Sequence, residues 1–337
     1  MDPISQGIVG AALAQSKAKK NSIIKIGVIG FMAGMAPDLD VLIKSSTDPI
    51  LSLEYHRQFT HSLLFIPFGA MIVALMIFPL IKRSLSFKTV YLASFLGYAT
   101  HGLLDACTSY GTLLYWPLSN ERVTWNSISV VDPLFTIPII ILVLTAMITR
   151  KRLFSFFAIG WMTFYLLLGF VQYERALSVA TELAHSRGHK PERLTLKPSF
   201  GNLILWKSIY QYEERFYVDA IRTTRSSTWC LGENIRVFDY QYHLPNLEKD
   251  SQQRKDIERF RWFSQDYLGF DDDKNLVTDV RYSMIPNQIA PMWGLVIDVK
   301  RGIKEHAIWW TSRGLEQSQL SLFKDMLSGK NCINNQR

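Results

Sequence analysis

The stretch SLLFIPFGAMIVALMIFPLI, residues Ser62–Ile81, is twenty residues long and contains no charged side chain. A helix of about 20 consecutive apolar residues spans the hydrocarbon core of a bilayer. The stretch therefore predicts a membrane-spanning helix. This stretch directly follows YHRQFTH, residues Tyr55–His61. Two imidazoles and a guanidinium therefore lie at the N-terminal end of the predicted span.

Five other apolar segments surround this one. Three are long: Phe87–Cys107, Val130–Thr149 and Leu153–Val171. Two are shorter, Ile4–Ser16 and Ile23–Ala36, and their Gly and Ala residues permit close helix packing. Any one of them has a buried soluble helix as its alternative, but four long segments within 110 residues favour a membrane. We expect an α-helical membrane domain of about four long and two short helices, without a cleavable signal peptide.

The charges divide the chain of 337 residues into two regions. Residues 1–172 contain 8 of the 29 acidic and 13 of the 37 basic side chains, whereas the remainder has a normal soluble mixture. In the second region, stretches such as LTLKPSF, IRVFDYQYHL and HAIWWTS have aromatic and β-branched residues at period two and predict a small antiparallel sheet. QQRKDIERFRWFSQDYL predicts an amphipathic helix. We expect the membrane domain at 1–172 and a smaller external α+β domain at 173–337.

The basic residues near the segment ends predict the orientation. Cytoplasmic loops of membrane proteins are enriched in Lys and Arg. With alternating crossings, ten cations fall on one face: Lys17, Lys19, Lys20, Lys25, Lys82, Arg83, Lys88, Arg150, Lys151 and Arg152. The acidic residues of the first region then fall at or near the other face. We expect a multi-pass protein of the cytoplasmic membrane whose C-terminal domain is extracytoplasmic.

Four stretches bring imidazoles and carboxylates to the predicted outer boundary. They are APDLD, YHRQFTH, HGLLD and VVDPLF. His101 and Asp105 are four residues apart, so on a helix they project from one face. The candidate metal ligands are Asp38, Asp40, His56, His61, His101, Asp105 and Asp132.

Such ionisable groups in membrane segments are costly and usually serve function. Imidazole and carboxylate are ligands for divalent Zn, Mn or Fe. Seven candidates exceed the needs of one tetrahedral ion, which leaves two metals, or one metal with a general base, as alternatives. We expect Asp40 or Asp105 to accept a proton from water and Arg57 to hold an anionic oxygen. Asp132 before Pro133 is equally typical of a helix N-cap, and Asp2 and Gln6 of a terminal cap.

Several blocks, in order over about residues 1–140, resemble the YdjM-like family of bacterial inner-membrane proteins. The blocks are MDPISQGIVGAAL, APDLDVL, HRQFTHSLLF, THGLLDACTSYGTLLYWPLS and NSISVVDPLFTIP. That family is described as membrane-bound metal-dependent hydrolases. The resemblance implies metal-dependent hydrolysis, with the seven candidate ligands at the matching motif positions. Some relatives have His at the position of Gln6.

The expected function is hydrolysis of an ester or phosphoester at the outer face of the membrane. The expected partners are membrane lipids and an amphipathic, lipid-linked or otherwise anionic substrate. H-E-x-x-H and G-x-S-x-G motifs are absent from the sequence, which leaves zincin-like proteases and serine hydrolases unsupported.

The alternatives are a metal-binding membrane scaffold without activity, a partner-binding protein, or a transporter. A transporter should have ionisable groups at mid-membrane and inverted repeats, and neither is evident. No basic run is interleaved with aromatics, so nucleic acid is not an expected partner. Cys230 and Cys332 both fall in the external domain, where a disulfide is permitted, but pairing cannot be read from the sequence.

Overall fold

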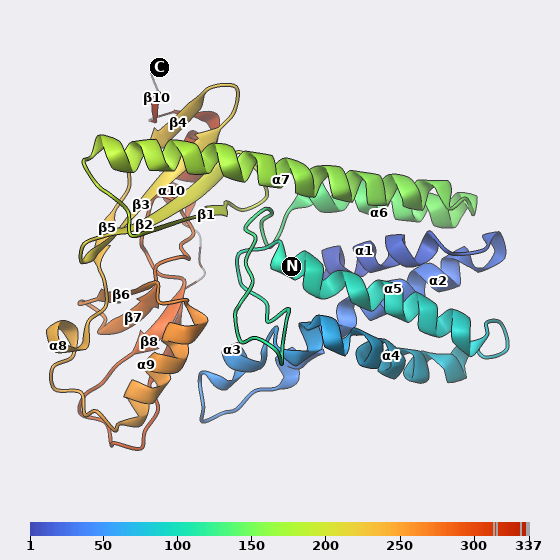
Figure 1. Ribbon diagram of the computed structural model, residues 1–337, viewed down its shortest axis with the longest axis horizontal. Coiled ribbons are helices and arrows are strands. Elements are labelled where there is room, and N and C mark those ends of the chain that lie inside the picture. The colour runs from blue at the N-terminus through green and yellow to red at the C-terminus, as the bar shows by residue number, and fades with distance from the viewer. Residues whose placement is uncertain (313, 315, 331, 335–337) are drawn as a thin grey trace. The chain divides into compact units, whose positions relative to one another are not determined.

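A computed structural model describes residues 1–312, 314, 316–330 and 332–334 (Figure 1). The chain forms two compact units, each built from three segments. The first contains Met1–Ile43, Tyr55–Val171 and Phe200–Asn202; the second contains Lys44–Glu54, Gln172–Ser199 and Leu203–Arg337. The main boundary lies inside one long helix, and the short segment Lys44–Glu54 belongs to the second unit although both its neighbours belong to the first.

The first unit is helical. Its α-helices are α1 (Pro3–Gln15), α2 (Ile23–Met35), α4 (Ile66–Ile81), α5 (Phe87–Ala106), α6 (Pro133–Thr149) and the first part of α7 (Leu153–Ser186). Shorter turns of the first unit are η1 (Lys20–Ser22), η2 (Ala36–Leu42), η3 (Phe59–His61) and η4 (Leu63–Phe65). The short helix α3 (Leu51–Tyr55) lies almost entirely in the segment Lys44–Glu54 of the second unit. Three helical stretches are long and apolar enough to cross a membrane: Lys20–Leu42, Leu63–Ile81 and Leu153–Ser186. α6 is a shorter apolar helix.

Side-chain caps set the first residues of three of these helices. Asp2 accepts a hydrogen bond from the Ser5 amide at 3.0 Å and begins α1, as expected for a terminal cap. Ser86 caps α5, and Asp132 caps α6 with proline at the first helical position. A proline there lacks only an amide hydrogen that the helix start would leave unpaired.

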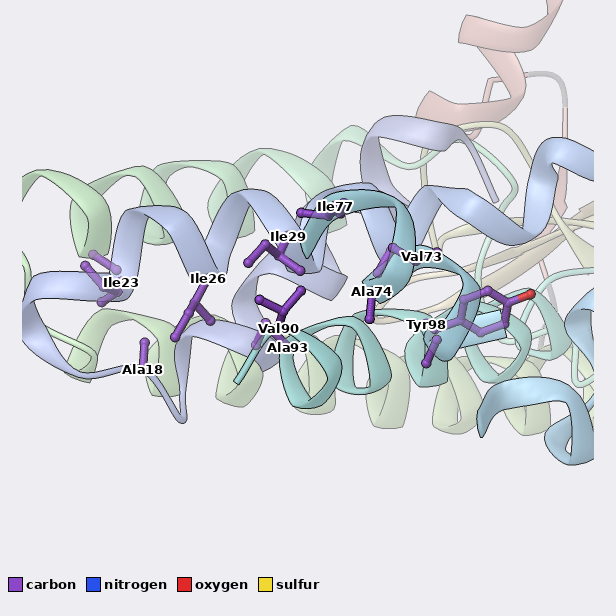
Figure 2. Close-up of a cluster of buried hydrophobic side chains, with 14 residues drawn as sticks. Ala18, Ile23, Ile26, Ile29, Val73, Ala74, Ile77, Val90, Ala93 and Tyr98 are labelled. Atoms are coloured by element: carbon purple, nitrogen blue, oxygen red, sulfur yellow. The ribbon is translucent and has the colours of Figure 1, made fainter. Parts of the chain in front are cut away.

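Glycines allow α1, α2 and α5 to pack against one another closely. A Cβ placed on Gly97 would lie 2.4 Å from the carbonyl oxygen of Gly30, and one on Gly30 would lie 2.6 Å from that of Gly10. Around this crossing the core is apolar. Figure 2 shows Ile26 and Ile29 among buried side chains that also come from α4 and α5. The two short apolar segments are therefore tightly packed helices.

The connections α1–α2, α4–α5 and α6–α7 lie at the same end of the first unit, on the right in Figure 1. The ten cations noted in the sequence lie on these connections and the adjoining helix turns. Because α4 and α5 are joined at that end, the C-terminal end of α5 lies at the other end of the unit. His101 and Asp105 occupy that C-terminal part of α5.

The second unit contains two antiparallel sheets where the sequence predicted one. The larger has the order β1 (Arg193–Pro198), β2 (Leu205–Tyr212), β3 (Arg215–Thr223), β4 (Ser227–Cys230), β10 (Ile333–Asn334), with β5 (Asn234–Arg236) also paired to β3. The smaller has the order β6 (Leu268–Asp271), β7 (Leu276–Asp279), β8 (Trp293–Val296), β9 (Ile308–Thr311). The helices are α8 (Tyr240–His243), α9 (Gln252–Phe263), α10 (Gln317–Ser328) and the end of α7.

One predicted strand is partly wrong. IRVFDYQYHL begins in β5 but continues into α8, because the Asp239 side chain accepts from the Tyr242 amide at 2.8 Å and starts a helical turn. Cys230 and Cys332 form a disulfide, which settles the pairing that the sequence left open.

The segment Lys44–Glu54 is held to α9 by one arginine. Arg259 Nη2 lies 2.9 Å from Asp48 Oδ2, and its Nε lies 2.7 Å from Glu54 Oε1. Burial alone would raise the pKa of Asp48, but hydrogen bonds from Arg259 and from the Ile50 amide lower it below its usual value. The ion pairs explain why this segment belongs with the second unit.

Candidate metal centre

Four side chains converge in the first unit: Asp38, His61, His101 and Asp105. Each offers one ligand atom, and these atoms all lie within 4.8 Å of one another. His61 Nε2 is 2.9 Å from His101 Nε2 and 3.3 Å from Asp105 Oδ2. Asp38 Oδ1 is 3.4 and 3.3 Å from the two imidazole nitrogens, and Asp105 Oδ2 is 3.6 Å from that of His101.

These separations fit one tetrahedral ion. Zinc–ligand bonds of about 2.0–2.2 Å place neighbouring ligand atoms about 3.3–3.6 Å apart. Four of the five measured separations fall in that range, and the imidazole pair is slightly closer. Two nitrogens and two carboxylate oxygens are a usual donor set for zinc and also suit manganese or iron.

The ligands reach this point from separate elements. Asp38 lies on η2, His61 on η3, and His101 and Asp105 one turn apart on α5. A Cβ on Gly102 would lie 2.2 Å from the carbonyl oxygen of His61. The missing side chain therefore lets η3 press against α5 between its two ligands. His61, His101 and Asp105 are at most 2% exposed.

Hydrogen bonds to the far nitrogens orient both imidazoles. His101 Nδ1 lies 2.5 Å from the carbonyl oxygen of Gly34, which can only accept, so its Nε2 is free of hydrogen when the ring is neutral. His61 Nδ1 faces Thr60 Oγ1 at 2.9 Å and Asp40 Oδ2 at 3.3 Å. Where neither Nε2 carries hydrogen, the two lone pairs face each other, and a proton or a metal ion between them stabilises that arrangement.

The surrounding carboxylates favour that positive charge. Burial lowers the pKa of His61, but hydrogen bonds with Asp105, Asp38 and Asp40 outweigh it and raise the pKa to about 9. The carboxylates therefore favour positive charge at this point of the cluster.

The two carboxylate oxygens of Asp105 have different surroundings. Oδ1 accepts from Gln6 Nε2 at 2.8 Å and from the amino group of Met1. Oδ2 accepts no hydrogen bond from the described residues, although Arg57 Nε lies 3.0 Å away. This oxygen faces the Nε2 atoms of His61 and His101 as well as the Arg57 guanidinium, so it is the Asp105 oxygen available as a metal ligand. The sequence missed this role of Met1 and Gln6, which carry no ligand-like signature.

Asp40 is hydrogen-bonded to several neighbours through both of its carboxylate oxygens. Oδ1 lies 2.7 Å from His56 Nδ1, and Oδ2 accepts from the Arg57 amide and from Thr60 Oγ1, both at 2.9 Å. Asp38, Asp40 and His56 also form a group that could hold an ion. An ion there would have to replace the Asp40–His56 hydrogen bond, so the first group is the better site.

Arg57 differs in its contacts from the expectation. Its side chain is 5% exposed; Nε faces Asp105, Nη1 donates to Thr108 Oγ1 at 3.1 Å, and the guanidinium lies 4.8 Å from the centre of the Tyr110 ring. These contacts neutralise and position Asp105 and leave little of the guanidinium for an anionic substrate.

Asp132 is not brought to the cluster. Its Oδ1 accepts from the amides of Leu134 and Phe135, and its Oδ2 accepts from the Tyr165 hydroxyl at 2.9 Å. It belongs to no possible metal-binding group among the described residues. We correct its predicted role from metal ligand to helix cap, the alternative that the proline after it also indicated.

A third group, Asp48, Asp256 and His306, lies in the second unit. Arg259 Nη1 is 2.9 Å from Asp48 and 3.3 Å from Asp256, so a cation already neutralises these carboxylates. The group is a salt-bridge network that needs no metal.

Comparison with known proteins gives one match. A family model described as YdjM inner membrane protein matches residues 1–176, more than half of the chain. The match covers every residue of the four-ligand cluster. No curated protein and no solved structure matches the chain at a significant level.

Proposed function

The chain belongs to the YdjM inner membrane protein family, and from this premise we propose that it is a metal-dependent hydrolase at the outer face of the cytoplasmic membrane. The observation that supports a metal most directly is the cluster of two imidazole nitrogens and two carboxylate oxygens at tetrahedral spacing. Zinc fits this set best, and manganese or iron remain options for the same ligands. A bound divalent ion supplies Lewis acidity and eases deprotonation of water.

His56 is the best proton acceptor in this proposal. Its Nδ1 is hydrogen-bonded to Asp40, which orients the ring as a carboxylate does in other His–Asp pairs. The His56 side chain is 20% exposed, whereas that of Asp40 is buried and occupied by several donors. His56 therefore replaces Asp40 and Asp105 as the group that takes the proton. Asp40 positions it, and Arg57 positions Asp105.

The surroundings of the cluster suit an amphipathic substrate. Leu39 and Leu42 lie on the same short helix as Asp38 and are 62% and 71% exposed. Apolar side chains beside a polar site favour a lipid-like ester or phosphoester whose chains rest on them.

Two features support the proposed orientation. The cations gather at the opposite end of the first unit, which the positive-inside rule assigns to the cytoplasm. The second unit has a disulfide, and disulfides persist in oxidising compartments such as the bacterial periplasm. A second unit on the extracytoplasmic side agrees with both the positive-inside rule and the disulfide.

The geometry also favours one alternative, a structural metal site without catalysis. Four protein ligands fill a tetrahedral ion, as in closed structural sites, whereas a catalytic site keeps one position open. The exposure of Asp38 bears on the choice between a structural and a catalytic site. Its side chain is 18% exposed while those of the other three ligands are fully buried, so it is the ligand that water or substrate can displace.

The test combines metal content with activity. Full-length protein purified in detergent should contain about one ion per chain, and His61→Ala and His101→Ala should each lose it. His306→Ala removes an imidazole from a carboxylate group of the second unit and should keep the ion. Hydrolysis of an ester or phosphoester lipid that is lost in His56→Ala, with metal retained, supports the enzyme. Retained metal with no hydrolysis across ester, phosphoester and amide lipids supports the scaffold.

A further inference from the structure

A basic pocket lies at the end of the first unit away from the metal cluster. Its volume is about 680 Å³, and it is formed by the α1–α2 and α6–α7 connections. Six cationic side chains line it: Lys17, Lys19, Lys20, Arg150, Lys151 and Arg152. Among the residues that the structure describes, no acidic side chain lines it.

The backbone concentrates these charges. Arg150 has a left-handed conformation, with φ 57°, and ends α6, and α7 begins at Leu153. Three consecutive cations therefore fall in one tight turn beside the lysines of the α1–α2 connection. None of the six forms an ion pair with a described residue, although many other surface cations of the protein do. Like charges so close repel one another, and an anion in the pocket would relieve that repulsion.

The walls of the pocket are not only basic. Ala18 and Ile23 line it as buried apolar residues, and Leu153 lines it while remaining 55% exposed. Beyond it, Ile148 on α6 and Phe157 on α7 are 82% and 55% exposed. A free inorganic phosphate has no apolar part that could pack against these surfaces. A lipid has acyl chains that can lie along apolar helix faces while its headgroup contacts the cations.

We propose that this pocket binds the phosphate headgroup of an anionic phospholipid, with the acyl chains along the exposed apolar faces of α6 and α7. Basic pockets between helices at the cytoplasmic side are suited to such headgroups, and each Lys or Arg near an anionic surface strengthens binding about fivefold. Six cations favour a lipid with two phosphates over one with a single phosphate. The proposal is independent of the metal cluster and of any hydrolysis.

The test measures lipid retention by full-length, delipidated protein in a nonionic detergent, using native mass spectrometry across a range of lipid concentrations. The probes are diphosphatidylglycerol, phosphatidylglycerol, phosphatidylcholine and inorganic phosphate. Wild type should bind the first two saturably, diphosphatidylglycerol more tightly. The pocket variant Lys17→Gln/Lys19→Gln/Lys20→Gln should bind them about 100-fold more weakly.

The matched control is Lys82→Gln/Arg83→Gln/Lys88→Gln. It removes three cations from the same end of the unit, at the α4–α5 connection, and these do not line the pocket. The control should bind lipid as wild type does. Single variants Lys20→Gln and Lys151→Gln, which disturb insertion less, should each weaken binding about fivefold.

Three results would overturn the proposal. Equal loss of binding in the control triple variant would mean that general positive charge, and not the pocket, holds the lipid. Phosphatidylcholine bound as tightly as the anionic lipids would remove the role of the cations. Inorganic phosphate bound as tightly as phosphatidylglycerol would make the ligand a free anion.

Discussion

At the scale of single residues, the two ring nitrogens of His61 face two different sets of side chains. Nε2 faces Asp38, His101 and Asp105, whereas Nδ1 faces Asp40 and Thr60. Asp40 therefore faces the imidazole of His61 from the side opposite the other three cluster residues. Partners of this kind are often as important for metal affinity as the ligands themselves.

Replacing Asp40 should weaken metal binding without removing a ligand. Asp40→Asn keeps the size of the side chain but loses a charged acceptor for His56 and His61, so we expect a 10- to 100-fold lower zinc affinity. Competition with a zinc-binding dye measures it. Asp48→Asn, which alters a carboxylate paired with Arg259, is the matched control and should leave zinc affinity unchanged. An unaltered affinity in Asp40→Asn would mean that Thr60 alone orients His61.

A second residue-scale prediction concerns a buried lysine. Lys207 on β2 donates to Ser283 Oγ at 2.6 Å and to the Gln288 carbonyl at 2.8 Å, and burial lowers its pKa to about 7. Between pH 7 and about 10.5 the unfolded chain binds more protons at this residue than the folded chain. Stability should therefore rise with pH in that window, by about 1.4 kcal/mol per unit from this group.

Lys207→Met should remove that rise. The thermal unfolding midpoint of full-length wild type, compared with that of the variant, should increase from pH 7 to pH 10. Parallel pH profiles for the two proteins would show that Lys207 keeps an ordinary pKa in the folded state.

The sequence singled out the four side chains of the cluster as candidate metal ligands, but not the groups that orient them. Asp38, His61, His101 and Asp105 stand out because ionisable residues are rare in apolar segments and because the last two share a helix face. The acceptor for His101 is the carbonyl of Gly34, and a backbone oxygen has no signature in a sequence. Asp132 was ambiguous for a related reason, since an aspartate before a proline serves equally well as a cap or a ligand.

At the scale of elements, close helix packing depends on particular glycines. Gly97→Ala would place a methyl group 2.4 Å from the Gly30 carbonyl, which is backbone and cannot rotate away. We expect a loss of about 1–3 kcal/mol or more, measured as a lower unfolding midpoint in detergent. Gly160→Ala on α7 is the control, because nothing lies within 4 Å of the new methyl group. It should be neutral or slightly stabilising. Similar midpoints for both variants would mean that α2 and α5 can separate at little cost.

Elements with strong local signals were predicted well. α5 begins after its Ser86 cap and ends within a residue of the expected segment. The α8 turn was missed because Tyr, Phe and Val around Asp239 favour a strand, and the cap that starts a helix there is a single side chain. β4, four residues long, and α10 were missed as well, since their pairing and packing depend on distant parts of the second unit.

At the scale of the whole molecule, the disulfide joins residues 102 positions apart. A cross-link over so long a loop typically contributes about 2–4 kcal/mol. A reductant should therefore lower the unfolding midpoint of wild type, and Cys230→Ser should have the lower midpoint with or without reductant. Cys107→Ala changes the buried free cysteine and should stay sensitive to reductant. A wild-type midpoint indifferent to reductant would mean that Cys230 and Cys332 contribute nothing by pairing.

The change from an apolar helical region to a C-terminal region with antiparallel sheets was visible in the sequence, but the exchange of segments between the two units was not. Lys44–Glu54 has an ordinary loop composition, and the side-chain contacts that join it to α9 are the pairings of Asp48 and Glu54 with Arg259, more than 200 residues away. Long-range ion pairs of this kind leave no local pattern.

The origin of the four ligands on η2, η3 and α5 has a practical consequence. Under the proposed metal binding, a fragment that lacks one of these elements could not complete the coordination sphere, so the fraction of purified chains that retain an ion would report how many have assembled these helices correctly. Metal content would then serve as a quality assay for reconstitution, independent of whether a substrate is in hand.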